Sequence, residues 1–151
     1  MRTAADLARP SETPSNVEIV ARLFDEAFNA GNLDVLAELV HTGFTNFGRI
    51  ANGPAFLAEL IRAQRTAFPD MRFETLQMLA ADDWVITKMR WTGTFQAGFG
   101  FIGFAGIEPT GRSFDVEHAH AFRLADGKIA EHWAVRDDLT MHDQLLGRRA
   151  A

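Results

Sequence analysis

The chain has 151 residues, a length that suits one domain with a sizeable buried core. Hydrophobic residues make up 47% and charged residues 23%, which is typical of a globular protein and excludes an intrinsically disordered one. A formal net charge of −5, with no basic run, argues against a nucleic acid as partner. The absence of cysteine excludes a disulfide framework and thiolate chemistry, and it fits a cytoplasmic location.

The chain reads as a flexible N-terminal tail at 1–13, followed by a single domain at 14–147. The tail contains charged residues and prolines but no apolar stretch of the kind found in a signal peptide. No uninterrupted apolar run is long enough to cross a bilayer, so no membrane partner is expected.

Helices are predicted in the first half of the chain. The first begins at Ser15 or Asn16, either of which can cap it, and ends at Gly31. A short second helix is predicted at 32–40, and a third is predicted at 54–67 because apolar residues recur there at helical spacing.

Strands follow in the second half. Alternating runs at 71–81, 84–95, 114–124 and 128–137 predict long strands, and a short strand is expected at 44–47. Helices first and strands afterwards indicate an α+β fold, with helices covering one face of a curved antiparallel sheet.

The last two strands form the clearest element, because the Asp-Gly pair at 126–127 between alternating runs is a strong hairpin signal. A two-residue turn with unbroken pairing sets His120 opposite Trp133 and His118 opposite Val135. Slipping the turn by one residue would divide the apolar residues between the two faces, so we favour this register.

The face that this register produces is mostly apolar but carries His118, His120 and Asp137. Burying such groups unpaired is costly, so we expect this face to be a pocket wall rather than plain core. Trp133 offers a flat surface to a ligand. His132 is expected to face the opposite way, toward solvent or an interface.

Asp137 is a candidate general acid/base, because a carboxylate in apolar surroundings has a raised pKa and can exchange protons near neutral pH. His118 and His120 are candidate proton shuttles. The competing interpretation is that Asp137 caps the last helix, although Asp138, directly before Leu139, is the better cap. A metal site formed by the two histidines and Asp137 is a further alternative, for which no fourth ligand stands out.

A glycine- and phenylalanine-rich stretch lies between Phe95 and Arg112, and loops of this length are usually functional or mobile. We interpret it as an apolar flap over the pocket mouth, which includes Phe99 and Phe101. The alternative is an exposed apolar loop used for dimer packing. Asn46 could hydrogen-bond a substrate carbonyl, or it could be an ordinary turn residue.

Several short motifs together resemble the SnoaL-like polyketide cyclases of the nuclear transport factor 2 superfamily. The resemblance covers roughly residues 16–147. The motifs, in chain order, are Phe28-Asn29-Ala30-Gly31-Asn32-Leu33-Asp34, Ala67-Phe68-Pro69-Asp70, Trp91-Thr92-Gly93-Thr94, Pro109-Thr110-Gly111-Arg112, Phe122-Arg123, Asp126-Gly127-Lys128-Ile129, Glu131-His132-Trp133, Asp137 and Gln144-Leu145.

This resemblance implies a cone-shaped α+β fold, in which a bent sheet and helices enclose a deep apolar pocket, usually in a homodimer. It implies acid–base chemistry without metal or cofactor. In the family, an Asp at the position matching Asp137 removes and returns protons during an intramolecular aldol ring closure, and His or Asp is common at the position of His120. Other members of the superfamily are isomerases, dehydratases, epoxide hydrolases or plain binding proteins.

The chain departs from the family pattern in three places. Phe95 stands where the family often has His, the stretch before Pro109 is longer and rich in Phe, and His118 stands where small residues are common. These departures indicate a different or larger substrate than the family usually takes.

Residues and resemblance together predict a cofactor-independent enzyme that closes a ring in a small, polyketide-like substrate. The alternatives are an isomerase, a dehydratase or an epoxide-opening hydrolase, and a non-catalytic protein that binds hydrophobic ligands. The predicted catalytic residues are Asp137, His120 and His118, and the predicted substrate-binding residues are Trp133, Asn46, Phe47, Phe122, Trp91, Phe99 and Phe101.

Overall fold

The structure is a computed structural model that describes residues 14–51, 53–101 and 103–148. The predicted flexible tail at 1–13 lies outside the described residues. The helices are α1 (Asn16–Arg22), η1 (Leu23–Asn29, a π-helical stretch that continues α1), α2 (Leu36–Leu39), α3 (Gly53–Ala67) and α4 (Asp138–Leu146). The strands are β1 (Val40–Asn46), β2 (Arg49–Ile50), β3 (Arg72–Ala81), β4 (Trp84–Thr94), β5 (Ser113–Ala125) and β6 (Lys128–Arg136).

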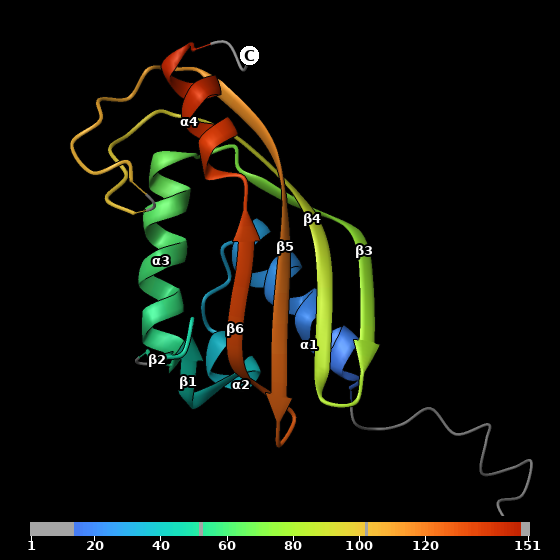
Figure 1. Cartoon of the computed structure of the whole chain (residues 1–151). Coiled ribbons are helices and arrows are strands. Elements are labelled where there is room, and N and C mark those ends of the chain that lie inside the picture. Colours follow the sequence, from blue (N-terminus) through green and yellow to red (C-terminus); the bar gives the residue numbers. More distant parts are fainter. Residues whose placement is uncertain (1–13, 52, 102, 149–151) are drawn as a thin grey trace, which may run out of the picture.

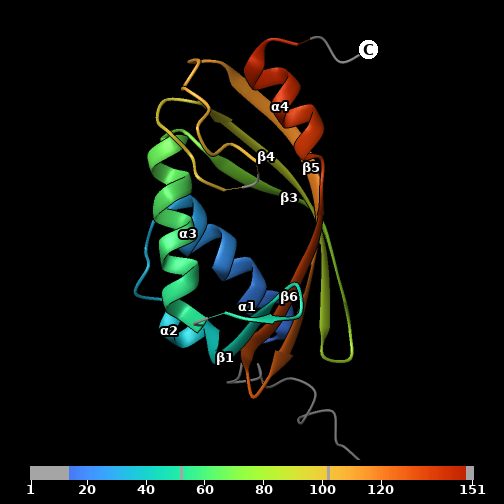
Figure 2. The ribbon, with the colours of Figure 1, turned by 60° about the vertical axis from the view of Figure 1, so that its left-hand side comes forward.

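The six described strands form one sheet in the order β2-β1-β6-β5-β4-β3 (Figure 1). All neighbouring strands are antiparallel except β1 and β6, which run parallel, so the sheet is mixed rather than purely antiparallel as expected. Figure 2 shows the sheet bent and twisted, with α1, α2 and α3 on one side of it. The predicted α+β fold with a curved sheet covered by helices is confirmed, and the sheet does not close into a barrel.

Local signals explain where the first helix begins. Ser15 is the N-cap of α1: its hydroxyl accepts a hydrogen bond from the Glu18 amide, and the Glu18 carboxylate accepts one from the Ser15 amide. This reciprocal pair satisfies two backbone donors that the first turn of a helix leaves free.

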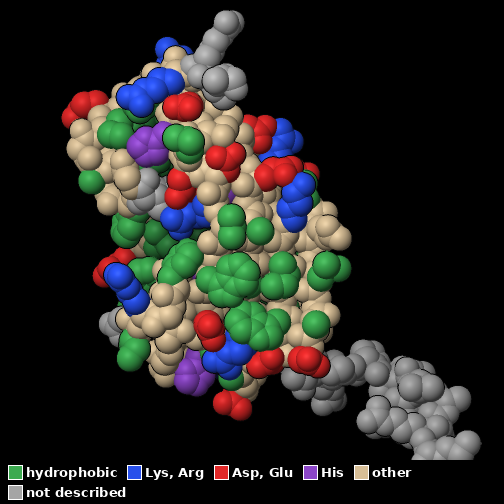
Figure 3. All heavy atoms as spheres, viewed as in Figure 1, with side chains coloured by type: hydrophobic (Ala, Val, Ile, Leu, Met, Phe, Trp, Pro, Cys, Tyr) green, Lys and Arg blue, Asp and Glu red, His purple; other side chains and the backbone are tan. Residues whose placement is uncertain are grey.

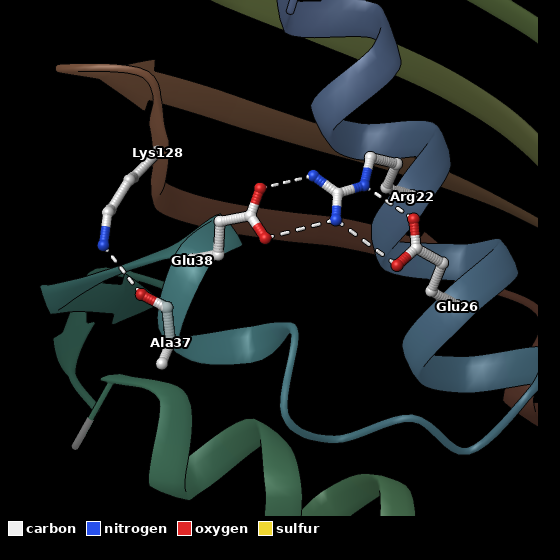
Figure 4. A network of polar contacts seen from close by, with 5 residues as sticks. All are labelled: Arg22, Glu26, Ala37, Glu38 and Lys128. Atoms are coloured by element: carbon white, nitrogen blue, oxygen red, sulfur yellow. Dashed lines mark hydrogen bonds and ion pairs between the residues drawn. The ribbon is translucent and has the colours of Figure 1, made fainter.

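A network of polar contacts at the surface connects α1, η1 and α2 (Figure 4). Arg22 lies 2.6 Å from Glu26 in η1 and 2.6 Å from Glu38 in α2. Lys128, at the start of β6, donates a hydrogen bond to the backbone carbonyl of Ala37. Solvent screens ion pairs as exposed as these, so the network orients α2 against the β5–β6 turn more than it stabilises the fold.

The core between sheet and helices is aromatic. Phe24, Phe44, Phe68 and Trp91 are almost completely buried. Trp91 stacks on Phe73, with ring centroids 5.1 Å apart and ring planes 4° from parallel. Aromatic side chains bury large areas and prefer offset or edge-to-face pairs, and most aromatic pairs in this core are tilted or edge-to-face.

The β5–β6 hairpin has the predicted turn but a different register beyond it. Pairing follows the prediction up to Ile129, after which Ala130 is an extra residue in β6, a β-bulge. From there on β6 is shifted by one residue, so His120 pairs with Ala134 and not with Trp133. The predicted unbroken register is wrong past Ile129, and a shift of one residue exchanges the two faces of the strand.

None of the helices in the described part of the chain is long and apolar enough to cross a membrane.

Gly93 in β4 provides a test of core packing. A Cβ atom there would lie 2.9 Å from the Phe114 ring and 3.0 Å from Cβ of Phe68. We expect Gly93→Ala to lower the free energy of unfolding by about 1–3 kcal/mol, because overpacking displaces buried side chains. Urea denaturation followed by tryptophan fluorescence measures the change. Gly98→Ala is the control, since a Cβ at Gly98 meets no atom within 4 Å; equal loss in both variants would contradict the packing argument.

Candidate active site

A cavity of about 160 Å³ lies between the sheet and the helices η1 and α3. Most of its wall is apolar. The lining residues are Leu23, Phe24, Phe28, Phe44, Asn46, Phe47, Phe56, Leu57, Leu60, Gln64, Phe73, Trp91, Phe99, Phe101, His118, His120, Phe122, His132 and Arg136. Phe47 and Phe101 are 46% and 38% exposed, and Arg136 is also exposed, so these three side chains mark the open side of the cavity.

Strand β5 places two imidazoles on the cavity wall. Its side chains alternate between buried and exposed, and His118, His120 and Phe122 are on the buried side. This agrees with the predicted placement of both histidines. Their catalytic role stays a prediction.

The bulge in β6 determines which side chains of that strand reach the cavity. His132 lines the cavity, whereas Trp133 is 40% exposed and Val135 is 66% exposed on the outer face of the sheet. The expectation that Trp133 faces the pocket and His132 faces away is therefore wrong. The apolar alternation of Ile129 and Trp133 suggested an unbroken strand, and nothing in the sequence marks Ala130 as an inserted residue.

Three polar side chains form a continuous chain of hydrogen bonds along the cavity wall. Oδ1 of Asn46 lies 2.7 Å from Nδ1 of His132, and Nε2 of His132 lies 3.0 Å from Nδ1 of His120. The strands explain this order, because Asn46 pairs with His132 across β1 and β6 and Phe122, next to His120 on the inner face, pairs with His132 across β5 and β6. We call this arrangement the Asn46–His132–His120 chain.

Five buried polar atoms on the cavity wall have no hydrogen-bond partner among the residues that the structure describes. They are Nδ1 and Nε2 of His118, Nε2 of His120, Nε1 of Trp91 and Oε1 of Gln64. A buried polar atom without a partner costs roughly 1–3 kcal/mol, and such atoms are rare in folded proteins. Their concentration around one cavity makes this the place where a polar ligand can find hydrogen-bond partners.

The imidazoles of the cavity are neutral at pH 7. Burial lowers the pKa of His118 to about 4, although the carboxylates of Asp138 and Asp137 oppose this change. Burial lowers the pKa of His132 to about 4, with a smaller contribution from Arg136. Burial, with the neighbouring His132, also lowers the pKa of His120 well below its ordinary value. A neutral imidazole has one donor and one lone pair, so each ring can accept a proton.

Asp137 lies outside the cavity. Its carboxylate accepts a hydrogen bond from the Thr140 amide and caps α4, and the side chain is exposed. The expectation that Asp138 is the better helix cap is wrong, and Asp137 lines, with His118, a separate pocket outside this cavity. Asp138 instead pairs with Arg136, at 3.1 Å. The bulge is the physical reason, since it shifts every later residue of β6 by one position.

Arg136 is a cavity residue that the sequence did not reveal. Its guanidinium group lies 5.7 Å from the centre of the Phe47 ring, a cation–π distance, and it bonds to Asp138. It lies opposite His118 across β5 and β6. The predicted register assigned Arg136 to the outer face, so no signal pointed to it.

The loop between β4 and β5 contributes to the cavity wall. Phe99 is buried, Phe101 is partly exposed, and both line the cavity, as the flap interpretation requires. Phe104 anchors the loop, because it is fully buried and stacks on His142 of α4 with ring centroids 4.0 Å apart.

Within the described residues, no group of three His, Cys, Asp or Glu side chains is arranged to hold a metal ion. The alternative set of His118, His120 and Asp137 forms no such group: His118 shares this cavity with His120 and shares a separate pocket with Asp137. Of the predicted substrate-binding residues, Trp133 is the one placed elsewhere; Asn46, Phe47, Phe122, Trp91, Phe99 and Phe101 all line the cavity.

A bent sheet and helices that enclose an apolar cavity with ionisable side chains on its wall define a protein of the nuclear transport factor 2-like class. The model of the SnoaL-like polyketide cyclase family matches residues 18–145, and the chain belongs to this family.

Known relatives agree. The aklanonic acid methyl ester cyclase DnrD of Streptomyces peucetius is 28% identical over 137 residues, which cover 87% of this chain and 90% of that protein. The nogalonic acid methyl ester cyclase of Streptomyces nogalater is 30% identical over 112 residues, which cover 70% and 79%. A SnoaL-like polyketide cyclase from Jannaschia sp. CCS1 has a similar structure, with a TM-score of 0.76, 26% identity and coverage of 95% and 99%.

Protonation of the buried histidines is expected to destabilise the fold in acid. The pKa of His118 is about 4 in the folded protein and near 6.5 in the unfolded chain, so the unfolded state binds more protons between these values. The free energy of unfolding therefore falls as the pH falls through this range, by on the order of 3 kcal/mol from His118 alone.

Urea unfolding measured from about pH 7 down to about pH 4 tests this expectation. The His118→Gln variant should lose less stability over that range than the wild type. His41→Gln, outside the cavity, should keep the wild-type slope. The same slope in the wild type and in His118→Gln would contradict the assignment.

Proposed function

We propose that this protein is a cofactor-independent cyclase that forms a carbon–carbon bond by an intramolecular aldol reaction in a polyketide-like substrate. Membership of the polyketide cyclase family supports the reaction class. Two relatives are cyclases of aklanonic acid methyl ester and of nogalonic acid methyl ester, which supports a similar substrate class. The observation that carries the proposal is the neutral, unpartnered Nε2 of His120 on the wall of an apolar cavity.

An aldol ring closure needs one proton removed from the carbon next to a carbonyl group. The resulting enolate carbon attacks a second carbonyl, and the oxygen of that carbonyl takes a proton. The base that takes the first proton can return it in the last step, so the reaction needs no further reactant. An imidazole can do both, because a single nitrogen accepts and then donates.

Two more groups are placed to bind substrate oxygens. Trp91 is 1% exposed, and its Nε1–H, which can only donate, has no partner. A fixed donor of this kind in an apolar cavity stabilises the negative charge of an enolate more than water does, because it needs no reorganisation. His118 offers either a donor or an acceptor beside it, with ring centroids 5.5 Å apart.

The cavity holds only part of a polycyclic molecule. Its volume of about 160 Å³ is smaller than the roughly 300–1,000 Å³ of common ligand pockets. We propose that the reacting part of the substrate lies among the histidines while the rest extends past Phe47 and Phe101 toward solvent.

The catalytic assignment differs from the one that the family resemblance implies. Asp137 caps α4 and does not line the cavity, whereas His120 and His118 do. We therefore propose that His120 exchanges protons with the substrate and that His118 assists. The role of Asp137 stays a prediction that the same assay decides.

Turnover of aklanonic acid methyl ester or nogalonic acid methyl ester by purified variants tests the proposal. We expect His120→Gln to lower kcat by about 100-fold or more, because it removes the acid–base group and keeps a polar side chain of similar size. Asp137→Asn should keep kcat within about tenfold of the wild type, well short of the loss that removal of a general acid or base causes. Thermal melting of both variants checks that they fold.

Two outcomes would contradict the proposal. A larger loss in Asp137→Asn than in His120→Gln would assign the proton transfer to Asp137. No turnover of either ester by the wild type, together with binding of flat aromatic ligands, would favour a non-catalytic binding protein.

We also propose that the protein is a homodimer that uses the outer face of its sheet. Leu79, Ile86, Trp133 and Val135 are exposed there, and Figure 3 shows hydrophobic side chains gathered on this face. Apolar surface of this kind is typical of an interface.

Sedimentation of the wild type and of Trp133→Glu tests the dimer. We expect the wild type to sediment as a dimer and the variant to shift toward the monomer, because a charge at the centre of an apolar interface would be buried unpaired. Leu139→Glu, an exposed position in α4, is the control. A monomeric wild type would refute the proposal.

A further inference from the structure

We infer that Asn46 and His132 are positioning residues that hold His120 in the tautomer with a lone pair at Nε2. The inference rests on the proposed function, in which His120 exchanges protons with the substrate. The three side chains come from β1, β6 and β5 and form the continuous Asn46–His132–His120 chain on the cavity wall.

The side chain of Asn46, at one end of the Asn46–His132–His120 chain, determines which nitrogen donates in each hydrogen bond. A neutral imidazole has one N–H and one lone pair, so a single hydrogen bond determines the others. Asn46 presents its carbonyl oxygen, which can only accept, and Nδ1 of His132 therefore donates. Nε2 of His132 then has the lone pair and accepts from Nδ1 of His120. Nε2 of His120 is left without a proton, as a base requires.

The residues around His120 keep the Asn46–His132–His120 chain uncharged in the absence of substrate. His120 is 8% exposed and is packed against the rings of Phe24 and Phe122. The charged and titratable side chains that face it are His132, His118 and Arg136, and each disfavours a positive charge on it. No carboxylate is among the described residues that line the cavity.

The Asn46–His132–His120 chain also allows the charge of a proton taken from the substrate to lie on His132 instead of on His120. When Nε2 of His120 takes a proton from the substrate carbon, the proton on its Nδ1 can move to Nε2 of His132. The positive charge then lies on His132, which is half-buried and whose Nδ1–H remains bonded to Asn46.

The cycle closes without any net change. His120, neutral again, has an N–H at Nε2 and donates this proton to the new alkoxide oxygen. The proton on Nε2 of His132 returns to Nδ1 of His120, and the starting tautomer is restored. One proton leaves carbon and one reaches oxygen.

Substitutions at Asn46 distinguish the effect of the hydrogen bond that its side chain accepts from the effect of the volume that its side chain fills. Aspartate accepts as the amide oxygen does, so Asn46→Asp should keep the tautomer and stabilise the protonated pair. Leucine offers no hydrogen bond, so Asn46→Leu should leave both tautomers populated. Thr45→Val, at the neighbouring position of β1 that does not line the cavity, is the control.

Nitrogen-15 NMR of histidine-labelled protein without substrate reads the tautomer directly. We expect His120 to show a protonated Nδ1 and a bare Nε2 in the wild type, in Asn46→Asp and in Thr45→Val. Asn46→Leu should show a mixture. A protonated Nε2 on His120 in the wild type would overturn the inference.

Kinetics supply the second readout, with aklanonic acid methyl ester as the probe. Asn46→Leu and His132→Phe should lower kcat by about 10- to 100-fold with little change in KM, as losses of orienting partners do. Asn46→Asp should restore kcat and move the acid limb of the kcat profile to higher pH, because a carboxylate next to His132 raises the pKa of the pair. An unchanged kcat and pH profile in Asn46→Leu would contradict the inference.

The two readouts distinguish this inference from the proposed function. The expected tautomers without turnover of any ester would reject the cyclase proposal and leave the positioning of His120 in place. Turnover that is insensitive to Asn46, with an unaltered tautomer in Asn46→Leu, would reject the positioning and leave the cyclase proposal in place.

Discussion

The β-bulge at Ala130 is the constraint on which the site depends. Both neighbours of β6 show a register shift at this place, since the pairing with β5 skips Ala130 between Ile129 and Glu131 and the pairing with β1 shifts between Val40 and Thr45. Because side chains alternate along a strand, one inserted residue exchanges the faces of all that follows. His132 thereby reaches the cavity and meets Asn46, Trp133 moves to the outer face, and Asp137 is left to cap α4.

Elements that depend on local chemistry were predictable from the sequence. The cap at Ser15 and the turn at 126–127 have the expected forms, and both turn residues have positive φ, as such a turn demands. The inward faces of β4 and β5 also followed from alternation, so Trp91, His118 and His120 were placed correctly. The inner face of β6 was not predictable, because a bulge is set by pairing on both sides of a strand rather than by its own residues. The motif containing His132 and Asp137 was recognised, but its side chains were assigned to the wrong faces.

The aromatic core and the polar atoms of the cavity have opposite effects on stability. Stacked and edge-to-face rings around Trp91 and Phe73 bury a large apolar area, which stabilises the fold. The same enclosure leaves five polar atoms without partners, at a cost of roughly 1–3 kcal/mol each. A ligand with matching oxygens can satisfy these atoms on binding. Such local destabilisation is expected where function, rather than stability, determines the residues.

Electrostatic interactions in the cavity determine where a transferred proton is most stable. In the proposed reaction, transfer from substrate carbon to His120 creates an imidazolium and an enolate together, and at about 4 Å their attraction is about 4 kcal/mol for an effective dielectric constant of 20. In that reaction, moving the positive charge to His132, whose ring centre lies 5.3 Å from that of His120, lowers the attraction to between roughly 2 and 4 kcal/mol. The hydrogen bond from charged His132 to the Asn46 carbonyl contributes about 1.5–3 kcal/mol, while burial of His132 opposes the charge. The bond to Asn46 thus offsets part of the attraction that is lost when the positive charge moves to His132.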